Sequence, residues 1–160
     1  MATTDLNAFG DRLTLSAQGL RFGLLVARWN DQITEALFTG ARETLLKAGA
    51  SAEDCIRWDV PGSFELVYGA ARMQQQLQLD AIIAIGSVIQ GETRHFDFVC
   101  QAVSQGIARL NEKGDIPVIF CVLTDDNLQQ ALDRSGGQHG NKGVEAAAAA
   151  VEMAHLRLKN

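Results

Sequence analysis

Residues Asp80-Ala81-Ile82-Ile83-Ala84-Ile85-Gly86-Ser87 give the strongest strand signal in the chain. A short apolar run that is rich in isoleucine and bounded by polar or glycine residues is typical of a β-strand. Because its apolar residues do not alternate with polar ones, such a run is consistent with burial on both faces, as in a parallel sheet covered by helices. The run therefore predicts a buried strand over residues 80–87.

The segments around this strand extend the pattern. Residues 22–27, Phe-Gly-Leu-Leu-Val-Ala, form a second apolar run, and residues 55–60 and 117–123 are two further predicted strands. Apolar residues at helical spacing occupy the segments between and after them. The predicted helices cover about 31–48, 63–76, 96–110, 127–134 and 141–158, with Asn30 or Asp31 capping the first and Ser63 the second.

Regular alternation of strands and helices predicts a parallel sheet with helices on both faces. Right-handed crossovers leave few topologies, and a four-stranded flavodoxin-like sheet is the simplest of them. We therefore expect a flavodoxin-like three-layer α/β/α sandwich. The 160 residues suit one compact domain. The polar, mixed residues 1–18 are interpreted as an N-terminal arm that precedes a single domain over residues 19–160.

Composition narrows the class of protein. Lys and Arg number 14 against 19 for Asp and Glu, so the formal net charge is -5. That balance argues against a nucleic-acid binder or an anionic-membrane binder, both of which carry a basic stripe.

No apolar stretch approaches the length that spans a bilayer. Cys55, Cys100 and Cys121 lack CxxC spacing and fall in apolar runs, so we expect buried free thiols and a cytoplasmic protein.

Open α/β sheets bind ligands outside the carboxyl ends of their strands, which selects residues 28–30, 61–65, 86–95 and 124–126 of this chain. The third of these segments is the most informative. It holds a glycine, a threonine hydroxyl and an arginine just before a predicted helix, a pattern that suits a phosphate cradle. Glycine and threonine are also frequent in such turns for geometric reasons alone. The histidine that ends it, His95, is either a proton-transfer group or a helix-start residue bonded to backbone.

Other candidates at the strand ends also have two interpretations. Trp29 could stack on a flat heterocycle or anchor the first helix. Phe64 could stack similarly, although its place on a helical face favours core packing, and Glu65 in a first helical turn favours the helix dipole without any ligand. Arg134 and Lys142 flank a glycine-rich link and would suit an anionic substrate. Arg134 could equally terminate its own helix.

Taken together, five stretches are similar to the lumazine synthase family, in the family's order and spacing. The resemblance covers residues 22 to about 156. The matching stretches are 21–30 (RFGLLVARWN), 60–65 (VPGSFE), 84–97 (AIGSVIQGETRHFD), 117–124 (PVIFCVLT) and 140–147 (GNKGVEAA).

The resemblance implies a transferase that condenses 5-amino-6-(D-ribitylamino)uracil with 3,4-dihydroxy-2-butanone 4-phosphate to give 6,7-dimethyl-8-ribityllumazine, in the penultimate step of riboflavin biosynthesis. It implies catalytic roles for His95 in proton transfer and for Arg134, which reaches the substrate phosphate from an adjacent subunit. The residues implied in substrate binding are Trp29, Ser63, Phe64, Glu65, Ser87, Val88, Ile89, Gly91, Glu92 and Thr93, with Phe120 and Lys142 from the neighbouring subunit.

Individual roles follow from the same resemblance. Trp29 would stack on the pyrimidine ring, residues 63–65 would bind the ribityl chain, and residues 88–89 would border the ring. Residues 91–93 would form the phosphate loop, in which Gly91 permits an unusual backbone angle. Four positions depart from the commonest family pattern and bear on substrate affinity more than on reaction type. They are Gln90 for a frequent Arg, Glu92 for Ala, Arg94 for Thr or Pro, and Cys121 for Gly.

The family resemblance also has implications for assembly. It implies a homopentamer with sites between neighbouring subunits, and the compact glycine link at 136–141 is the kind associated with an icosahedral shell. Riboflavin synthase is an implied partner, whereas no cofactor is implied. His139 and His155 lack the spacing of a metal cluster, so no metal is predicted.

Two other classes of protein share the expected fold. A flavin-binding electron carrier would need a Ser/Thr-rich phosphate loop directly after the first strand, where this chain has Ala27-Arg28-Trp29-Asn30-Asp31. A flavin-storage or shell protein of the same family would keep the fold with weak or no activity. The presence of His95, Arg134 and Lys142 argues against that second alternative.

Overall fold

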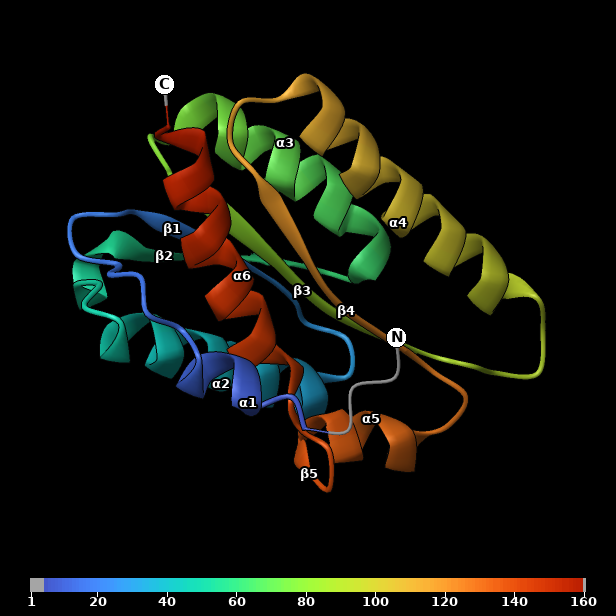
Figure 1. The fold of residues 1–160 in the computed structure, drawn as a ribbon. Helices are drawn as coiled ribbons and strands as arrows, with labels where there is room; N and C mark the ends of the chain where they lie inside the picture. Colours follow the sequence, from blue (N-terminus) through green and yellow to red (C-terminus); the bar gives the residue numbers. More distant parts are fainter. Residues whose placement is uncertain (1–4, 160) are drawn as a thin grey trace.

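The apolar runs of the sequence become the strands of one parallel sheet in the computed structural model, which describes residues 5–159 (Figure 1). The strands are β1 Phe22–Ala27, β2 Cys55–Val60, β3 Ala81–Ile89 and β4 Val118–Asp125. They lie in the order β2-β1-β3-β4, and every neighbouring pair is parallel. The expected flavodoxin-like sandwich with a four-stranded parallel sheet is confirmed.

The two central strands explain the lack of alternation in their sequences. Every residue of β1 is buried, and so are the first seven residues of β3. Successive side chains point into different cores: Phe22 and Leu24 lie in one cluster, whereas Leu25 lies in the other. Because helices cover both faces of the sheet, the buried side chains of these strands are apolar, with Ser87 near the end of β3 as the exception.

The helices form the two outer layers (Figure 1). One face of the sheet carries α2 Asp31–Lys47 and α6 Lys142–Arg157, and the other carries α3 Leu66–Gln76 and α4 His95–Lys113. The alanine-rich α6 packs closely on α2: a Cβ atom added at Gly143 would lie 2.0 Å from the Leu37 carbonyl oxygen. Small residues on α6 therefore allow the two helix backbones to approach each other.

The turn after β2 differs from its prediction. Residues Ser63–Glu65 form a short 3-10 helix, η2, before α3 begins at Leu66, and the N-cap position belongs to Gly62. The prediction of Ser63 as a helix N-cap was therefore wrong. Its side chain is buried and its hydroxyl donates to the Ser87 carbonyl oxygen at 3.5 Å, because the neighbouring strand offers an acceptor within reach.

The chain after β4 contains a small hairpin that the sequence analysis did not predict. Helix α5 Leu128–Arg134 is followed by β5 Ser135–Gly137 and β6 Gly140–Asn141, which pair in antiparallel fashion. The glycine-rich link is thus ordered: Gly136 and Gly140 have φ values of 124° and 82°, which a side chain disfavours. The Asn141 side chain then caps α6 by accepting from the Gly143 N–H.

Residues 5–18 pack against the body of the molecule and contain the short helix α1 Ala8–Asp11. Leu6 is buried, and its N–H donates to the His139 carbonyl oxygen at 2.9 Å. Residues 1–4 of the predicted arm lie outside the described residues, and the boundary between an arm and a domain stays a prediction.

The three cysteines are free, but only Cys121 is buried, while Cys55 and Cys100 are half-buried. The expectation of three buried thiols was wrong, since β2 is an edge strand and α4 exposes much of its surface.

Among the described residues, no helix has the length and apolar character to cross a membrane.

Candidate active site at the carboxyl end of the sheet

An open cavity of about 590 Å³ lies where β1, β2 and β3 end. Its walls come from the loop after β1, the 3-10 helix η2, the end of β3 and the start of α4. Eight residues that the sequence analysis named line it together, namely Trp29, Ser63, Phe64, Glu65, Ser87, Val88, Ile89 and His95. Four separate segments of the sequence therefore converge on one hollow.

Trp29 stands at the mouth of this cavity. Its backbone N–H donates to the Pro61 carbonyl oxygen at 3.0 Å, and its side chain remains 67% exposed. The next residue, Asn30, has a φ of 60°, a left-handed conformation that asparagine tolerates. The Asn30 amide does not cap α2 and instead donates to the Ser87 carbonyl oxygen at 3.0 Å. This tie turns the chain sharply and holds Trp29 outward, so Trp29 does not anchor the first helix.

Gly62 lies directly against the Trp29 ring. A Cβ atom at this position would come within 2.4 Å of the indole Cε3. The Gly62 N–H donates to Glu65 Oε2 at 3.0 Å, which fixes the glutamate across the turn. The Glu65 carboxylate therefore lies at the start of a helix, as its local interpretation expected, and it also forms part of the cavity wall.

Phe64 and Phe98 give the cavity aromatic walls. Phe64 is 58% exposed, so the local expectation of core packing was wrong. The 3-10 turn rotates Phe64 outward, and Leu66 takes the core position instead. Phe98 is 68% exposed and was not predicted. Its position three residues after His95, on the same side of a helix, was the signal that could have found it.

Ser87 provides a polar group inside the cavity wall. It is 4% exposed, and its hydroxyl oxygen is buried without a hydrogen-bond partner among residues 5–159. Its carbonyl oxygen accepts from both Asn30 and Ser63. A buried hydroxyl of this kind is suited to a ligand, since an unpaired buried polar group costs about 1–3 kcal/mol.

The predicted phosphate loop over residues 91–93 is exposed and borders the cavity at His95. The His95 backbone N–H donates to the Thr93 hydroxyl oxygen at 3.4 Å. Gly91 does not adopt a positive φ, and a Cβ atom there would meet nothing within 4 Å. The freedom that glycine permits at residue 91 is therefore not used for a left-handed conformation.

Three predicted site residues lie away from this cavity. Phe120 is on β4, Arg134 ends α5 and Lys142 begins α6. The Arg134 guanidinium donates to the Gln130 carbonyl oxygen at 3.0 Å, so its local role at the end of α5 is present. Lys142 forms an ion pair with Glu145. The described residues that line the cavity include no Lys or Arg.

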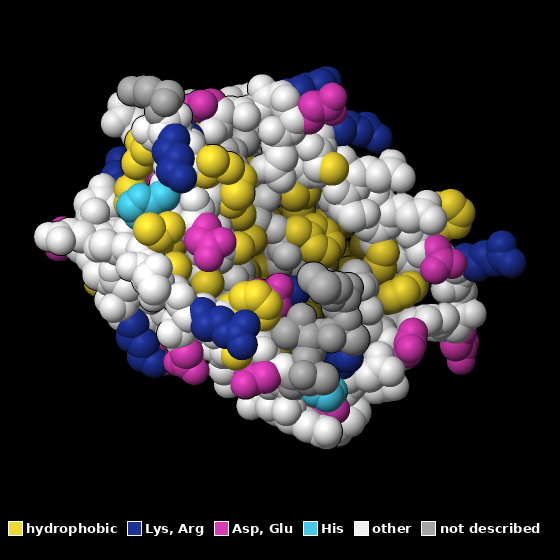
Figure 2. Space-filling view, viewed as in Figure 1, with side chains coloured by type: hydrophobic (Ala, Val, Ile, Leu, Met, Phe, Trp, Pro, Cys, Tyr) yellow, Lys and Arg dark blue, Asp and Glu magenta, His cyan; other side chains and the backbone are white. Residues whose placement is uncertain are grey.

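Phe120 belongs to a second hollow of about 390 Å³, where Met153 and Leu156 of α6 lie beside β4. Figure 2 shows hydrophobic side chains gathered in a recess on the face of the molecule that carries β4 and α6. Phe120, Met153 and Leu156 are all partly exposed there. This β4–α6 surface is an exposed apolar patch, the kind of surface that typically contacts another protein.

Another hollow, of about 1080 Å³, lies at the opposite end of the sheet. One of its arginines is already paired, since Arg157 bridges Asp80 and Asp115. Helices α3 and α4 end there and direct their carbonyl groups toward it, which disfavours an anion. The described residues hold no cluster of three His, Cys, Asp or Glu side chains that could bind a metal.

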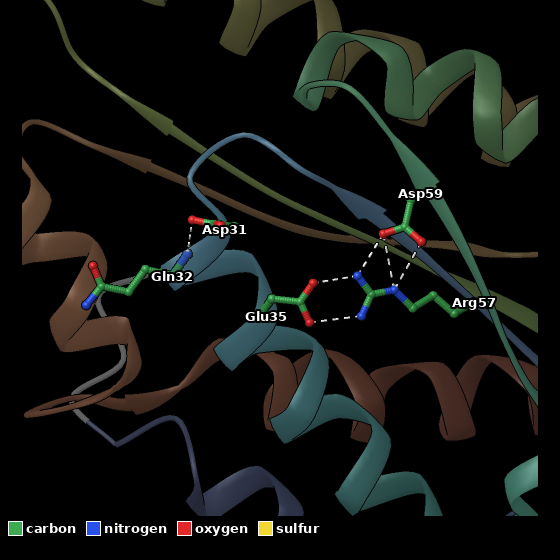
Figure 3. A network of polar contacts seen from close by, with 5 residues as sticks. All are labelled: Asp31, Gln32, Glu35, Arg57 and Asp59. Atoms are coloured by element: carbon green, nitrogen blue, oxygen red, sulfur yellow. Dashed lines mark hydrogen bonds and ion pairs between the residues drawn. The ribbon is translucent and has the colours of Figure 1, made fainter.

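An ion-pair cluster links β2 to α2 (Figure 3). Arg57 of β2 donates to Glu35 of α2 at 2.9 Å and to Asp59 at 2.7 Å, and it lies over the Phe38 ring at 4.4 Å. The Arg57 hydrogen bond lowers the pKa of Glu35. The cluster ties α2, which follows Trp29, to the strand that leads into Gly62.

Comparisons with known proteins point to one family. Residues 19–157 match the family model described as 6,7-dimethyl-8-ribityllumazine synthase. A relative of that name from Flavobacterium johnsoniae is 58% identical over 159 residues, which cover 98% of this chain and 84% of the relative. The relative from Christiangramia forsetii is 56% identical, with 98% and 95% covered. One from Bacteroides fragilis is 52% identical, with 84% and 94% covered.

Proposed function

The chain belongs to the 6,7-dimethyl-8-ribityllumazine synthase family and is a transferase of riboflavin biosynthesis, and we propose that its strand-end cavity is the pyrimidine half of the active site. The reaction condenses 5-amino-6-(D-ribitylamino)uracil with 3,4-dihydroxy-2-butanone 4-phosphate to give 6,7-dimethyl-8-ribityllumazine, phosphate and water. The observation that carries the assignment of the site is the convergence of eight predicted residues on one cavity.

The pyrimidine ring stacks on Trp29 in this proposal. The exposed indole offers a flat apolar face, and base–aromatic stacking of this kind contributes about 1–3 kcal/mol. Glu65 accepts hydrogen bonds from the ribityl hydroxyls beside Ser63 and Phe64. The unpaired Ser87 hydroxyl and the backbone of Val88 and Ile89 bind the ring edge.

The chemistry requires no activated protein nucleophile. The free amine of the uracil attacks the ketone carbonyl and forms an imine with loss of water. Phosphate leaves by elimination, and the ribityl-bearing nitrogen closes the second ring with loss of another water. Holding the two substrates in register contributes up to about 7–11 kcal/mol in favourable cases. His95, at the cavity rim, transfers protons at the carbonyl oxygen, while the backbone N–H groups of residues 91–93 hold the phosphate.

A neighbouring subunit supplies the cations. The described residues that line the cavity include no Lys or Arg, and Arg134, Lys142 and Phe120 lie outside that lining. Two different surfaces that meet between copies form a heterologous interface, which generates a ring when the rotation between the copies closes. We assign this ring as a homopentamer, with an icosahedral shell of pentamers as the higher assembly and riboflavin synthase as a partner. The cytoplasm is the proposed compartment.

The activity assay tests the function directly. Purified protein mixed with both substrates should form the fluorescent lumazine well above the slow spontaneous rate at neutral pH. A rate equal to the spontaneous one would favour the storage alternative, which the relatives from Flavobacterium johnsoniae and Christiangramia forsetii, both named as synthases, do not support. A flavin absorbance in the purified protein would instead support the electron-carrier alternative.

A further inference from the structure

A buried carboxylate that the proposed mechanism does not use lies beside the proposed phosphate-binding arginine. Asp125 is the last residue of β4 and is 5% exposed. Its Oδ1 lies 3.9 Å from Arg134 Nη1. Its Oδ2 is buried without a hydrogen-bond partner among the described residues. Most buried polar atoms are paired, so an unpaired buried carboxylate oxygen calls for an explanation.

The geometry around Asp125 is fixed by its neighbours. The Asp125 carbonyl oxygen accepts from the Gln90 N–H at 2.9 Å, which holds the end of β4 against the loop that follows β3. The Asn127 side chain caps α5 by accepting from the Gln130 N–H at 3.0 Å. The Gln130 side chain in turn accepts from the Asp126 N–H at 3.0 Å. The turn that joins Asp125 to α5 is therefore held at several points.

Arg134 is held in a defined place with much of its hydrogen-bonding capacity unused. A guanidinium has five N–H donors, and one nitrogen of Arg134 donates to the Gln130 carbonyl oxygen at 3.0 Å. The separation of 3.9 Å from Asp125 is too long for a hydrogen bond but close enough for strong attraction. The side chain is 38% exposed, so part of the guanidinium faces outward.

We infer that Asp125 is a positioning residue: its carboxylate holds the Arg134 guanidinium so that the outward N–H groups are aligned for the ketone-phosphate substrate of the adjacent subunit. The inference rests on the proposed function of Arg134. Because Arg134 is a long side chain with much rotamer freedom, a fixed charge behind it lowers the entropy lost when phosphate binds.

Burial of the charged Asp125 carboxylate lowers the stability of the folded protein. A residue whose role is only to stabilise the fold would raise that stability, so the burial favours the positioning role. Burial raises the pKa of Asp125, the Arg134 charge opposes that rise and the Asp126 charge adds to it. A folded-state pKa above the unfolded value means that stability is greatest below the unfolded pKa and is lost as the pH rises through the folded pKa. At neutral pH the charged carboxylate is therefore a burden on the fold, as is common at functional sites.

The test compares Asp125→Asn with Asp126→Asn in the full assembled protein. Both changes remove one negative charge, but Asp126 is exposed and forms no hydrogen bond or ion pair with Arg134 among the described residues. We expect Asp125→Asn to lower kcat/KM for the ketone phosphate by about tenfold with the KM for the pyrimidine unchanged. Asp126→Asn should leave both values unchanged. Asp125→Ser serves as a second neutral variant if the amide folds poorly.

Two additional measurements decide the interpretation. Asp125→Asn should melt at the same or a higher temperature than the unaltered protein at neutral pH, with the difference shrinking as the pH falls. In an Arg134→Ala background, Asp125→Asn should add no further loss, since the two residues act as one unit.

If Asp125 acted on the phosphate only through its negative charge, Asp125→Asn would raise kcat/KM for the ketone phosphate, because removal of a negative charge strengthens phosphate binding. If Asp125→Asn and Asp125→Ser leave ketone-phosphate kinetics unchanged or improve them while Arg134→Ala impairs them, the inference fails and the proposed function stands. If Arg134→Ala itself has no effect, both the phosphate role of Arg134 and the inference fail.

Discussion

Glu65 combines a local role and a proposed substrate role in one side chain. Its carboxylate accepts the Gly62 N–H at 3.0 Å and lies in the wall of the cavity. Sequence reasoning offered these roles as alternatives, and the fold allows both, because each carboxylate oxygen has two lone pairs. The same holds for Arg134, whose bond to the Gln130 carbonyl oxygen leaves other donors unused.

The two proposed catalytic residues should differ in importance. We predict that Arg134→Ala lowers single-turnover kcat by about 100-fold, the loss typical of a group that stabilises developing charge. His95→Ala should cost less, because the condensation proceeds slowly without any dedicated base. Rapid-mixing fluorescence of lumazine formation measures the single-turnover rate of each variant. A larger loss for His95→Ala would contradict the division of roles between phosphate binding and proton transfer.

The thiols give a prediction that depends on burial. Burial raises the pKa of Cys121 to about 12, and it also raises the pKa values of the half-buried Cys55 and Cys100. Because the thiolate is the reactive form, a thiol reagent at neutral pH should modify Cys121 only after the protein unfolds. Mass spectrometry of peptides from the native and the denatured protein measures this order. Labelling of Cys121 in the native protein at the rate of Cys100 would show that β4 opens readily.

Elements were more predictable than the turns between them. The strands and long helices follow from apolar runs and helical spacing, which reflect burial along a whole segment. The turn at residues 63–65 depends instead on a contact with β3, 24 residues away, that no local pattern reveals. For the same reason the local pattern favoured core packing for Phe64, which is exposed in the structure. The hairpin at 135–141 was also missed, since its strands contain only three and two residues.

The turn after β2 is predicted to control Trp29 through Gly62. A Cβ atom at residue 62 would lie 2.4 Å from the indole, so Gly62→Ala must displace the ring. We expect a raised KM for the pyrimidine and a shifted Trp29 emission, measured in a Trp58→Phe background that leaves one tryptophan.

Gly91→Ala is the matched control for the emission measurement. An added Cβ atom there meets nothing within 4 Å, so the Trp29 spectrum should not change. An unchanged spectrum in Gly62→Ala would mean that the indole does not rest on this turn.

At the scale of the whole molecule, the cavity and the cations occupy different surfaces of one chain. The strand-end rule located the cavity from sequence, because parallel strands align their carboxyl ends. The separation of Phe120, Arg134 and Lys142 from it could not be derived from local pattern, since it depends on where β4, α5 and α6 lie in space. The β4–α6 surface also exposes Met153 and Leu156, which a neighbouring chain would cover.

Subunit complementation tests the shared site most directly. Trp29→Ala chains lose the stacking face but keep Arg134, and Arg134→Ala chains keep the cavity but lose the cation. When the two chains are refolded together in equal amounts, about one quarter of the interfaces in a heterologous ring pair an intact cavity with an intact arginine. We predict that the mixture regains about a quarter of the unaltered activity, well above either variant alone. Activity no greater than the average of the two separate variants would contradict a site completed by a neighbouring subunit.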